Sequence, residues 1–438
     1  MNKKTVIISC PINTMSGYGA RSRDVAKAFI ELDKYDVKII PQRWGNTPWG
    51  FIGWIFLNDH FFNPEPNKQY PQPDIWVQIT IPNEFQKQGK YNIGITAGIE
   101  STVAPADWIE GCNRMDLVLG STNHTIEVLK QSKFKKHDKN TNEVIGTIEL
   151  TTPTKVLFEG FNEDIYHNDY GAFNLSGVRE EFCYLFVGHW LNGEFGHDRK
   201  NISLLIKAFC ETFKNKQKQP ALILKTSHSG ASYMDREVTL KKIKQIKKSI
   251  KGKCPNVYLL HGEFTDVEMN SLYNHSKVKA MISLTKGEGF GRPLLEFTQS
   301  KKPIITTGWS GHVDFLQPNM SVLLPGVLND IHPSARNSWF IEGAKWFDVD
   351  QMALGKALKD TYKNYKSFNH RAKQQGNYCK KNFTFNKMKE LLGNILDENV
   401  KEAPQQVQLK LPKLSLPKLK KIGGENKIEL PKLKKIEI

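Results

Sequence analysis

The chain has 438 residues, of which 39% are hydrophobic and 11% aromatic, enough to bury the cores of two or three domains. Its apolar runs are far shorter than the roughly eighteen residues of a membrane-spanning helix, so we expect no transmembrane segment. The formal net charge of +17 predicts an anionic partner, and charge alone leaves nucleic acid, an acidic glycan and anionic lipid open.

The six cysteines are scattered along the chain, and no two of them have the spacing of a metal site or a redox pair. This usage is typical of a reducing compartment and argues against a disulfide framework or a zinc site. The basic and then apolar N-terminus lacks a small-residue cleavage site, so we interpret it as a first strand and not as a signal peptide. We therefore expect a cytoplasmic protein.

In the first half of the chain, short apolar runs typical of strands alternate with helical patterns. A glycine-bearing turn at Ser16-Gly-Tyr-Gly19 follows the first run and opens a helix that continues to about Leu32. Further helices are expected over 108–115 and 124–131. The expected strands are residues 5–10, 37–40, 75–79, 93–97, 117–119 and 156–158.

The same alternation restarts after residue 180. A strand at 183–187 leads into a polar, glycine-rich loop and then into an amphipathic helix that begins near Ile202. A lysine-rich helix is expected over 236–251, and further strands are expected over 221–225, 257–260, 279–284 and 303–307. This order predicts two doubly wound α/β domains, and such sheets bind ligands at the carboxyl ends of their strands.

Lysines gather at 133–139, at 241–253 and in the tail 401–438. Each of the first two clusters is either a solvated surface or a surface for an anionic partner. The tail repeats the motif Pro-Lys-Leu-Lys-Lys-Ile, with proline too frequent for a helix. It is either a flexible solvated segment or a docking segment that adds as a strand to the sheet of a protein partner.

The strongest chemical signal follows the strand expected at 279–284. Gly287, Gly289 and Gly291 allow the backbone to approach a ligand closely. Pro293 is typical of the first turn of a helix, and the N-terminus of that helix attracts phosphate. Taken alone, a glycine turn of this kind is more often structural than functional.

Glu288 lies in this glycine loop, and Glu296 lies in the first part of the helix behind it. Both side chains could face one ligand. A carboxylate would repel a diphosphate, so the role expected for these two residues is to accept hydrogen bonds from sugar hydroxyl groups. A helix-capping glutamate is the structural alternative.

Glu288-Gly-Phe-Gly-Arg-Pro-Leu-Leu-Glu296, followed by Lys302-Pro-Ile-Ile305 and Ser310-Gly-His-Val-Asp314, resembles the donor-site signature of retaining GT-B glycosyltransferases. The resemblance is to the large group 1 family, which uses nucleotide sugars without a metal ion, and it covers about residues 5–395. It implies an α/β fold of GT-B architecture, with two doubly wound Rossmann-like domains facing across a cleft and a flexible C-terminal tail. It implies no cofactor and no metal.

The resemblance also implies the domain limits. We expect an N-terminal, acceptor-side domain over 1–170 and a nucleotide-sugar donor domain over 171–370. A C-terminal helix within 371–400 is expected to pack back toward the first domain, and the repeat tail occupies 401–438.

The same resemblance implies specific roles for the residues of the glycine loop and the helix behind it. Glu288 is expected to contact the donor sugar, and Glu296 the ribose of the nucleotide. The backbone of Gly289, Phe290 and Gly291 is expected to lie against the sugar and phosphates. Arg292 is expected to belong to the same donor-binding set.

Phe186-Val-Gly-His189 and Arg199-Lys-Asn201 resemble the family's strand–loop–helix, in which a basic pair binds the donor diphosphate. Lys200 matches the lysine of that pair. His189 stands where an arginine is usual, so Arg199 or Lys225 is expected to supply the missing charge. Two cations beside a leaving diphosphate meet the main electrostatic demand of the reaction.

In the first half, Ser16-Gly-Tyr-Gly19 resembles the glycine loop that approaches the diphosphate, which assigns Gly17 and Gly19 to the donor site. Gly98-Ile-Glu-Ser101 also follows the family pattern.

The family's histidine near the reacting sugar is missing from the loop at 78–84, where Asn83 or Glu84 would take its place. No general base is assigned.

We therefore expect a hexosyl- or related transferase that moves a sugar from a nucleotide sugar to an acceptor hydroxyl with retention of configuration. Glu288 and Lys200 are its candidate catalytic residues. The acceptor is a glycan or modified DNA. Aromatic rings that could stack on either, or simply form core, are Trp44, Trp49, Phe51, Trp54, Phe56, Phe61 and Phe62.

Two other classes of function compete with this hypothesis. One is a GT-B-fold epimerase or phosphorylase, and the other is a non-catalytic virion or interaction protein that keeps the fold. The segments also resemble glycosyltransferases of tailed phages, which would place the protein in the host cytoplasm.

Overall fold

The structure is a computed structural model that describes residues 3–45, 47, 49–50, 55–65, 70–138, 141–169, 171–228 and 230–400. The repeat tail 401–438 lies outside the described residues, as do Phe51, Trp54 and the side chain of Phe56. Both large sheets belong to one compact unit, residues 1–400. No helix within the described ranges has the length and apolar character needed to cross a membrane.

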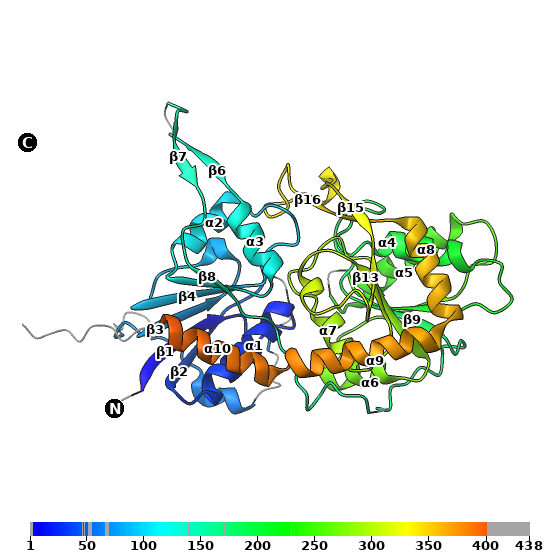
Figure 1. The fold of residues 1–438 in the computed structure, drawn as a ribbon, viewed down its shortest axis with the longest axis horizontal. Coiled ribbons are helices and arrows are strands. Elements are labelled where there is room, and N and C mark those ends of the chain that lie inside the picture. Colours follow the sequence, from blue (N-terminus) through cyan, green and yellow to red (C-terminus); the bar gives the residue numbers. More distant parts are fainter. Residues whose placement is uncertain are drawn as a thin grey trace, which may run out of the picture. The chain divides into compact units, whose positions relative to one another are not determined.

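The first sheet has six parallel strands in the order β2-β1-β3-β4-β5-β8 (Figure 1). Their buried side chains are mostly isoleucine, valine and leucine, and β4 and β5 are buried almost continuously, which suits strands covered on both faces. The bounds are β1 Lys4–Cys10, β2 Tyr35–Pro41, β3 Ile75–Ile79, β4 Tyr91–Thr96, β5 Leu117–Gly120 and β8 Thr154–Val156.

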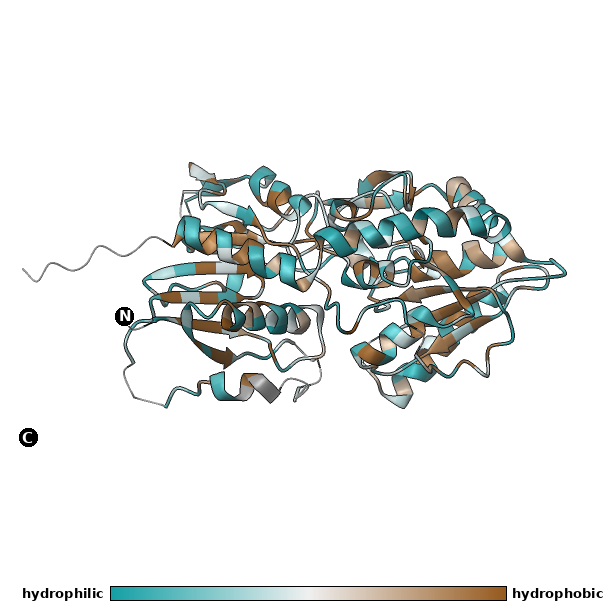
Figure 2. Cartoon of the chain, turned by 60° about the horizontal axis from the view of Figure 1, so that its bottom comes forward, coloured by the Kyte–Doolittle hydropathy of each residue, from teal (hydrophilic) through white to brown (hydrophobic). Residues whose placement is uncertain are grey.

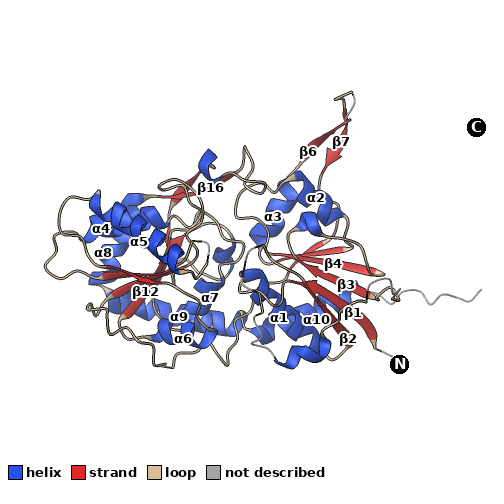
Figure 3. Ribbon diagram, turned by 180° about the vertical axis from the view of Figure 1, so that it is seen from behind, coloured by secondary structure: helices blue, strands red, loops and turns tan. Residues whose placement is uncertain are grey.

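Helices cover both faces of this sheet (Figure 3). Helices α1 and α10 pack on one face, and α2 and α3 contribute to the buried cluster on the other. The bounds are α1 Gly17–Glu31, α2 Ala106–Asn113, α3 Asn123–Gln131 and α10 Phe385–Asn399.

The second sheet also has six parallel strands, in the order β11-β10-β9-β12-β13-β14. Figure 2 shows that its strands are hydrophobic while the helices around them carry hydrophilic outer residues. The bounds are β9 Cys183–Val187, β10 Ala221–Lys225, β11 Val257–Leu260, β12 Val278–Ser283, β13 Ile304–Thr307 and β14 Val322–Leu324.

Helices α4, α5 and α8 pack on one face of the second sheet, and α6, α7 and α9 pack on the other. The bounds are α4 Ile202–Phe213, α5 Tyr233–Lys248, α6 Asp266–Asn274, α7 Arg292–Thr298, α8 Gln351–Lys363 and α9 Tyr365–Asn382. Short 3-10 turns occur at Ile55–His60, Pro82–Glu84, Gly311–Asp314 and Pro333–Ala335.

The predicted α/β fold is confirmed, and each strand expected from the sequence lies within two residues of an observed strand at either end. Two antiparallel pairs were not predicted. One is the hairpin β6 Phe134–His137 and β7 Val144–Ile148, which contains Lys135 and Lys136 of the first lysine cluster. The other is β15 Gly326–Asp330 with β16 Lys345–Val349.

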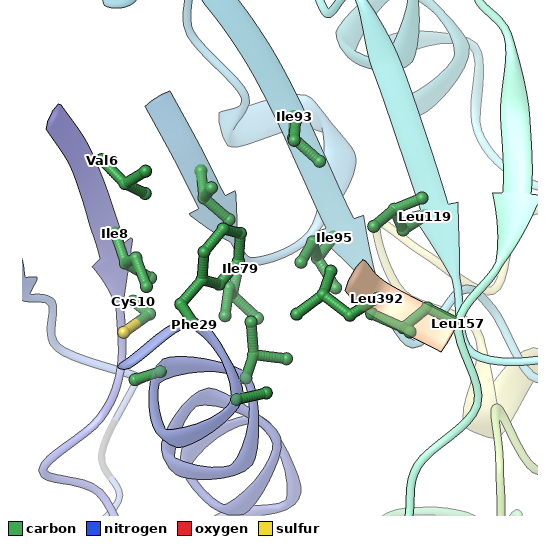
Figure 4. Close-up of a cluster of buried hydrophobic side chains, with 14 of the residues drawn as sticks. Val6, Ile8, Cys10, Phe29, Ile79, Ile93, Ile95, Leu119, Leu157 and Leu392 are labelled. Carbon is green, nitrogen blue, oxygen red and sulfur yellow. The ribbon is translucent and has the colours of Figure 1, made fainter. Parts of the chain in front are cut away.

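Helix α10 is distant from the first sheet in sequence but completes its core. Leu392 is fully buried and lies beside Ile95 and Leu157 (Figure 4). Met388 and Leu396 of the same helix are buried in this cluster as well. The final described helix thus closes a hydrophobic face that the first 160 residues leave open.

Truncating Leu392 should therefore destabilise the protein. We expect Leu392→Ala to lower the free energy of unfolding by about 2–5 kcal/mol, because the lost contacts leave a cavity under α10. Met352→Ala is the matched control, since Met352 is 86% exposed and its loss should change stability by less than about 0.5 kcal/mol. Calorimetric unfolding of the two variants tests this expectation. Equal transition temperatures would show that packing of Leu392 on the first sheet does not stabilise the fold.

Candidate functional site

The glycine loop lies at the carboxyl end of β12, between Ser283 and the first residue of α7. Gly291 caps α7 with a φ of 93°, in the left-handed region that favours glycine. The Glu288 amide donates to Ser310 Oγ at 2.9 Å, and the Gly311 amide donates to the Glu288 carbonyl at 2.9 Å. These bonds fix the backbone of Glu288.

Two glycines of this loop are packed against the backbone of the first half. A Cβ atom at Gly287 would lie 2.1 Å from the carbonyl oxygen of Glu100, and one at Gly289 would lie 2.5 Å from that of Ala97. Thr122 Oγ1 also donates to the Gly289 carbonyl at 2.9 Å. The close approach of these two glycines to the Glu100 and Ala97 carbonyls accounts for glycine at 287 and 289 without a ligand.

Glu288 lies at the centre of a buried charge cluster. One of its carboxylate oxygens pairs with the Lys200 ammonium, and the other lies 3.4 Å from Nη1 of Arg199. Arg199 Nη1 also donates to the Gly287 carbonyl at 2.8 Å and lies 3.2 Å from the Glu100 carboxylate. The structure thus brings together Glu288, Lys200 and Arg199, and adds Glu100 from the loop after β4.

The charge state of Glu288 follows from these neighbours. Burial alone would raise the pKa of its carboxyl, but the charges of Lys200 and Arg199 outweigh burial and lower the pKa to about 2. Glu288 is therefore a buried carboxylate at neutral pH, able to accept hydrogen bonds.

His189 and Lys225 lie beside this cluster and line a cavity of about 540 Å³. Lys225 Nζ donates to the Gly262 carbonyl at 2.9 Å and lies 5.1 Å from the ring centre of Phe264. Burial, followed by Lys225 and Lys200, lowers the pKa of His189, so its imidazole is neutral at pH 7. Lys225 rather than His189 provides the positive charge in this cavity.

The glycine loop of the first half reaches the same cavity. Ser16 and Gly17 line it, and Ser16 Oγ accepts the Gly19 amide at 2.9 Å as the N-cap of α1. A Cβ atom at Gly19 would lie 2.1 Å from the Thr14 carbonyl oxygen, so this position tolerates only glycine. The N-terminus of a fifteen-residue helix therefore faces the cavity and favours an anion there.

Arg292 and Glu296 lie in a second, separate cluster. Arg292 Nη1 lies 2.5 Å from the Asp24 carboxylate and 3.7 Å from that of Glu159, and its Nε donates to Glu296 at 2.8 Å. Burial raises the pKa of Glu296 to about 8, with Arg292 opposing the shift. Three carboxyl groups therefore already surround the Arg292 guanidinium.

Phe290 belongs to a hydrophobic core cluster through its side chain. Its side chain is buried and packs against Phe315, with ring centres 5.1 Å apart. Its side chain therefore supports the loop from the core, while only its backbone belongs to the loop.

Sequence reasoning missed several residues around Glu288. Glu100 and Ser310 lie in motifs that were recognised but given no role. His312 is fully buried, and its Nε2 lies 2.6 Å from the Thr307 carbonyl while its Nδ1 has no partner among the described residues. The motif Ser310-Gly-His-Val-Asp314 contains both Ser310 and His312, and it was the sequence feature that could have indicated a role for them.

A further cavity, of about 470 Å³, lies at the carboxyl edge of the first sheet. Glu84 lines it and accepts a hydrogen bond from the Thr80 hydroxyl, so the loop that lacks the expected histidine does face a cavity. Asn83 does not line it. The other side chains of interest here are Gln42, Arg43, Trp44, Trp76, Gln78, Gln86 and Gln88.

The aromatic run has a mixed environment. Trp44 packs on Tyr18 with ring centres 4.2 Å apart and lines both cavities of this region. Phe61 packs against the core of the first sheet, and Trp49 is half exposed. Within the described ranges, no three histidine, cysteine or acidic side chains converge to hold a metal ion.

Comparison by sequence gives no match, either to a protein-family model or to a curated protein. Comparison by structure does. A glycosyltransferase from Rickettsia africae is 13% identical and superposes with a TM-score of 0.60, covering 92% of this chain and 100% of the other. Sucrose-phosphate synthase from Thermosynechococcus elongatus is 11% identical with a TM-score of 0.59, covering 90% and 99%.

The Anabaena protein HepE, solved in complex with UDP and glucose, is 12% identical with a TM-score of 0.57 and covers 90% of this chain and 100% of its own. At these identities the similarity establishes the fold. The predicted GT-B architecture, with two Rossmann-like sheets, is thereby confirmed.

The ion pair of Glu288 with Lys200 makes a prediction about stability and pH. The folded pKa of Glu288, about 2, lies below its ordinary value of 4.5, so its ionised form stabilises the fold above pH 4.5 and loses this effect as the pH falls toward 2. Lys200→Met should cost roughly 3–5 kcal/mol at pH 7, since it leaves a buried carboxylate short of a partner. The difference from wild type should shrink below pH 4.5.

Guanidinium unfolding across this pH range measures the effect. Lys387→Met is the control, because Lys387 and Glu390 form an exposed pair expected to contribute at most about 1 kcal/mol. Equal losses in the two variants would mean that the buried pair contributes no more than a surface pair.

Proposed function

We propose that this chain is a glycosyltransferase that moves a sugar from a nucleotide-sugar donor to an acceptor hydroxyl group. The observation that carries the proposal is a cluster of cations at one edge of the second sheet. His189 lies near the charges of Lys225, Lys200 and Arg199, and the last two pair with the buried Glu288 carboxylate. On a GT-B fold this edge faces the N-terminus of α1, and the cations suit a diphosphate.

The donor diphosphate is proposed to lie between Lys225 and the N-terminus of α1 at Gly17, with Lys200 nearby. The Lys225 ammonium lies on one wall of this cavity and the positive end of α1 on the other, and the Glu263 carboxylate also lines it. Negative charge that develops on the leaving diphosphate is stabilised by these fixed cations and by the amides at the helix end. The neutral His189 can donate or accept one hydrogen bond but adds no charge.

Glu288 is proposed to accept hydrogen bonds from hydroxyl groups of the donor sugar. It is ionised and held in place at its backbone, so it can orient a sugar without moving. Glu296 is proposed as the partner of the ribose hydroxyls. Its present bond to Arg292 keeps its carboxyl group oriented, and a raised pKa lets it bind as donor or acceptor.

The acceptor is proposed to be a glycan that enters the cavity at the edge of the first sheet. Trp44 and Trp76 offer aromatic faces there, and several glutamine amides offer both donors and acceptors. This mixture suits a neutral polyhydroxylated ligand.

Transfer is proposed to retain the anomeric configuration. The bond from the anomeric carbon to the diphosphate oxygen breaks as the acceptor oxygen bonds to the same face of that carbon. The acceptor's proton passes to the departing diphosphate oxygen, and no metal ion is required. We also propose that residues 1–170 form the acceptor-side domain and 171–370 the donor domain.

A screen of nucleotide sugars by mass spectrometry, followed by acceptor trials, tests this proposal. Nucleoside diphosphate and a lengthened acceptor should appear together. Release of free sugar without an acceptor would indicate an epimerase or hydrolase instead, and dependence on inorganic phosphate would indicate a phosphorylase. Transfer to duplex DNA and not to a glycan would contradict the proposed acceptor class.

Lys225→Met should lower kcat/KM for the donor roughly a hundredfold, because one of the charges facing the diphosphate is lost. Lys207→Met is the matched control. Lys207 is an exposed lysine on α4 that lies outside the cavity, so its loss should leave the rate unchanged. Initial rates of nucleoside diphosphate release measure both, and an unaffected Lys225 variant would remove this residue from the donor site.

A further inference from the structure

Another polar cavity, of about 320 Å³, lies at the edge of the second sheet opposite to the proposed donor residues. The proposed donor residues follow the carboxyl ends of β9, β10 and β12. In contrast, Lys279 lies at the amino end of β12, and Lys302 precedes the amino end of β13. Strands of this length separate the two edges by about 15–20 Å.

Four lysines line this cavity, namely Lys279, Lys301, Lys302 and Lys373. No acidic side chain is among the residues that line it. Over the part of the chain that the structure describes, none of the four forms an ion pair with a carboxylate. Like charges around one concavity repel each other, and an anion between them would relieve this repulsion.

Lys302 is held in a defined position. Its Nζ donates to the carbonyls of Tyr273 and His275, both at 2.8 Å, which leaves one of its three N–H groups for a further partner. Burial, followed by the charge of Lys279, lowers the pKa of Lys302 to about 7. A nearby anion would favour its charged form.

Lys301 adopts a backbone conformation that lysine normally avoids. Its φ of 57° lies in the left-handed region, at the end of α7 where glycine or asparagine is usual. The chain therefore places a lysine at the cavity in spite of a conformational cost. Such outliers gather at ligand sites.

The rest of the lining supplies hydrogen-bonding groups. Ser300 and Asn274 are buried, and their donors are used within the protein, since the Ser300 hydroxyl donates to the Phe297 carbonyl and the Asn274 amide donates to the His167 carbonyl. Helix α9 begins at Tyr365, which also lines the cavity, so the positive end of this eighteen-residue helix adds to the lysine charges. Asn168, Ser276 and Asn369 complete the polar lining.

We infer that this lysine cavity binds a small phosphate-bearing anion at a site separate from the donor cavity. The lysine side chains provide the charge, and Asn168, Ser276 and Asn369 surround the remainder of the ligand. A concave site of this size fits a small molecule and not a polymer surface.

Lysine acetylation followed by mass spectrometry tests the inference on the full chain. Inorganic pyrophosphate should slow acetylation of Lys279, Lys301 and Lys373 several-fold. Lys241 and Lys244 are internal controls on the exposed face of α5 and should react at an unchanged rate. Protection of no lysine, of all lysines equally, or of Lys225 alone would overturn the inference.

Calorimetric titration with pyrophosphate provides a second test. The double variant K279Q/K373Q should lose about a hundredfold in affinity, taking about tenfold for each charged hydrogen bond. The double variant K241Q/K244Q removes the same charge from the surface of α5 and should bind as wild type does. Equal losses in both double variants would indicate a general charge effect and overturn the site.

Anionic lipid vesicles distinguish a headgroup from a free phosphate compound. If K279Q/K373Q weakens binding to phosphatidylglycerol vesicles but leaves pyrophosphate binding intact, the lysines form a membrane surface and the inference fails. If pyrophosphate does not compete with vesicle binding and still protects the cavity lysines, the ligand is a free anion as inferred.

Discussion

The buried carboxylate of Glu288 is the constraint on which the rest of the site depends. An ionised carboxylate is costly to bury, and here Lys200 and Arg199 provide the compensating charge. That requirement brings the loop after β9 to the loop after β12. Arg199 also contacts Glu100 and the Gly287 carbonyl, so the loop after β4 belongs to the same charge cluster.

Charge is divided unevenly between the two edges of the second sheet. At the carboxyl edge, cations are partly matched by Glu288 and Glu100, and the Lys225 ammonium faces an open cavity. At the amino edge, four lysines share a cavity without an acidic residue in its lining. Helix α7 runs between them, from Gly291 at the donor loop to the segment that contains Lys301. Part of the chain's excess of positive charge is thus gathered at two concave sites.

The sequence predicted those features that depend on local pattern. Strand periodicity predicted both sheets, and the glycine loop was correctly placed at the end of a strand. The hairpin around Lys135 was not predicted because its strands are short and mostly exposed, so they show no burial pattern. The contact of Gly289 with Ala97 and the pairing of Arg292 with Asp24 join residues far apart in the chain, and only the folded structure reveals them.

A crystal structure with the nucleotide sugar that the protein binds most tightly tests the central claim most directly. The proposed function predicts a diphosphate within hydrogen-bonding distance of Lys225 and the N-terminus of α1, with the sugar beside Glu288. A nucleotide bound elsewhere, with the cavity between Gly17 and Lys225 empty, would contradict it.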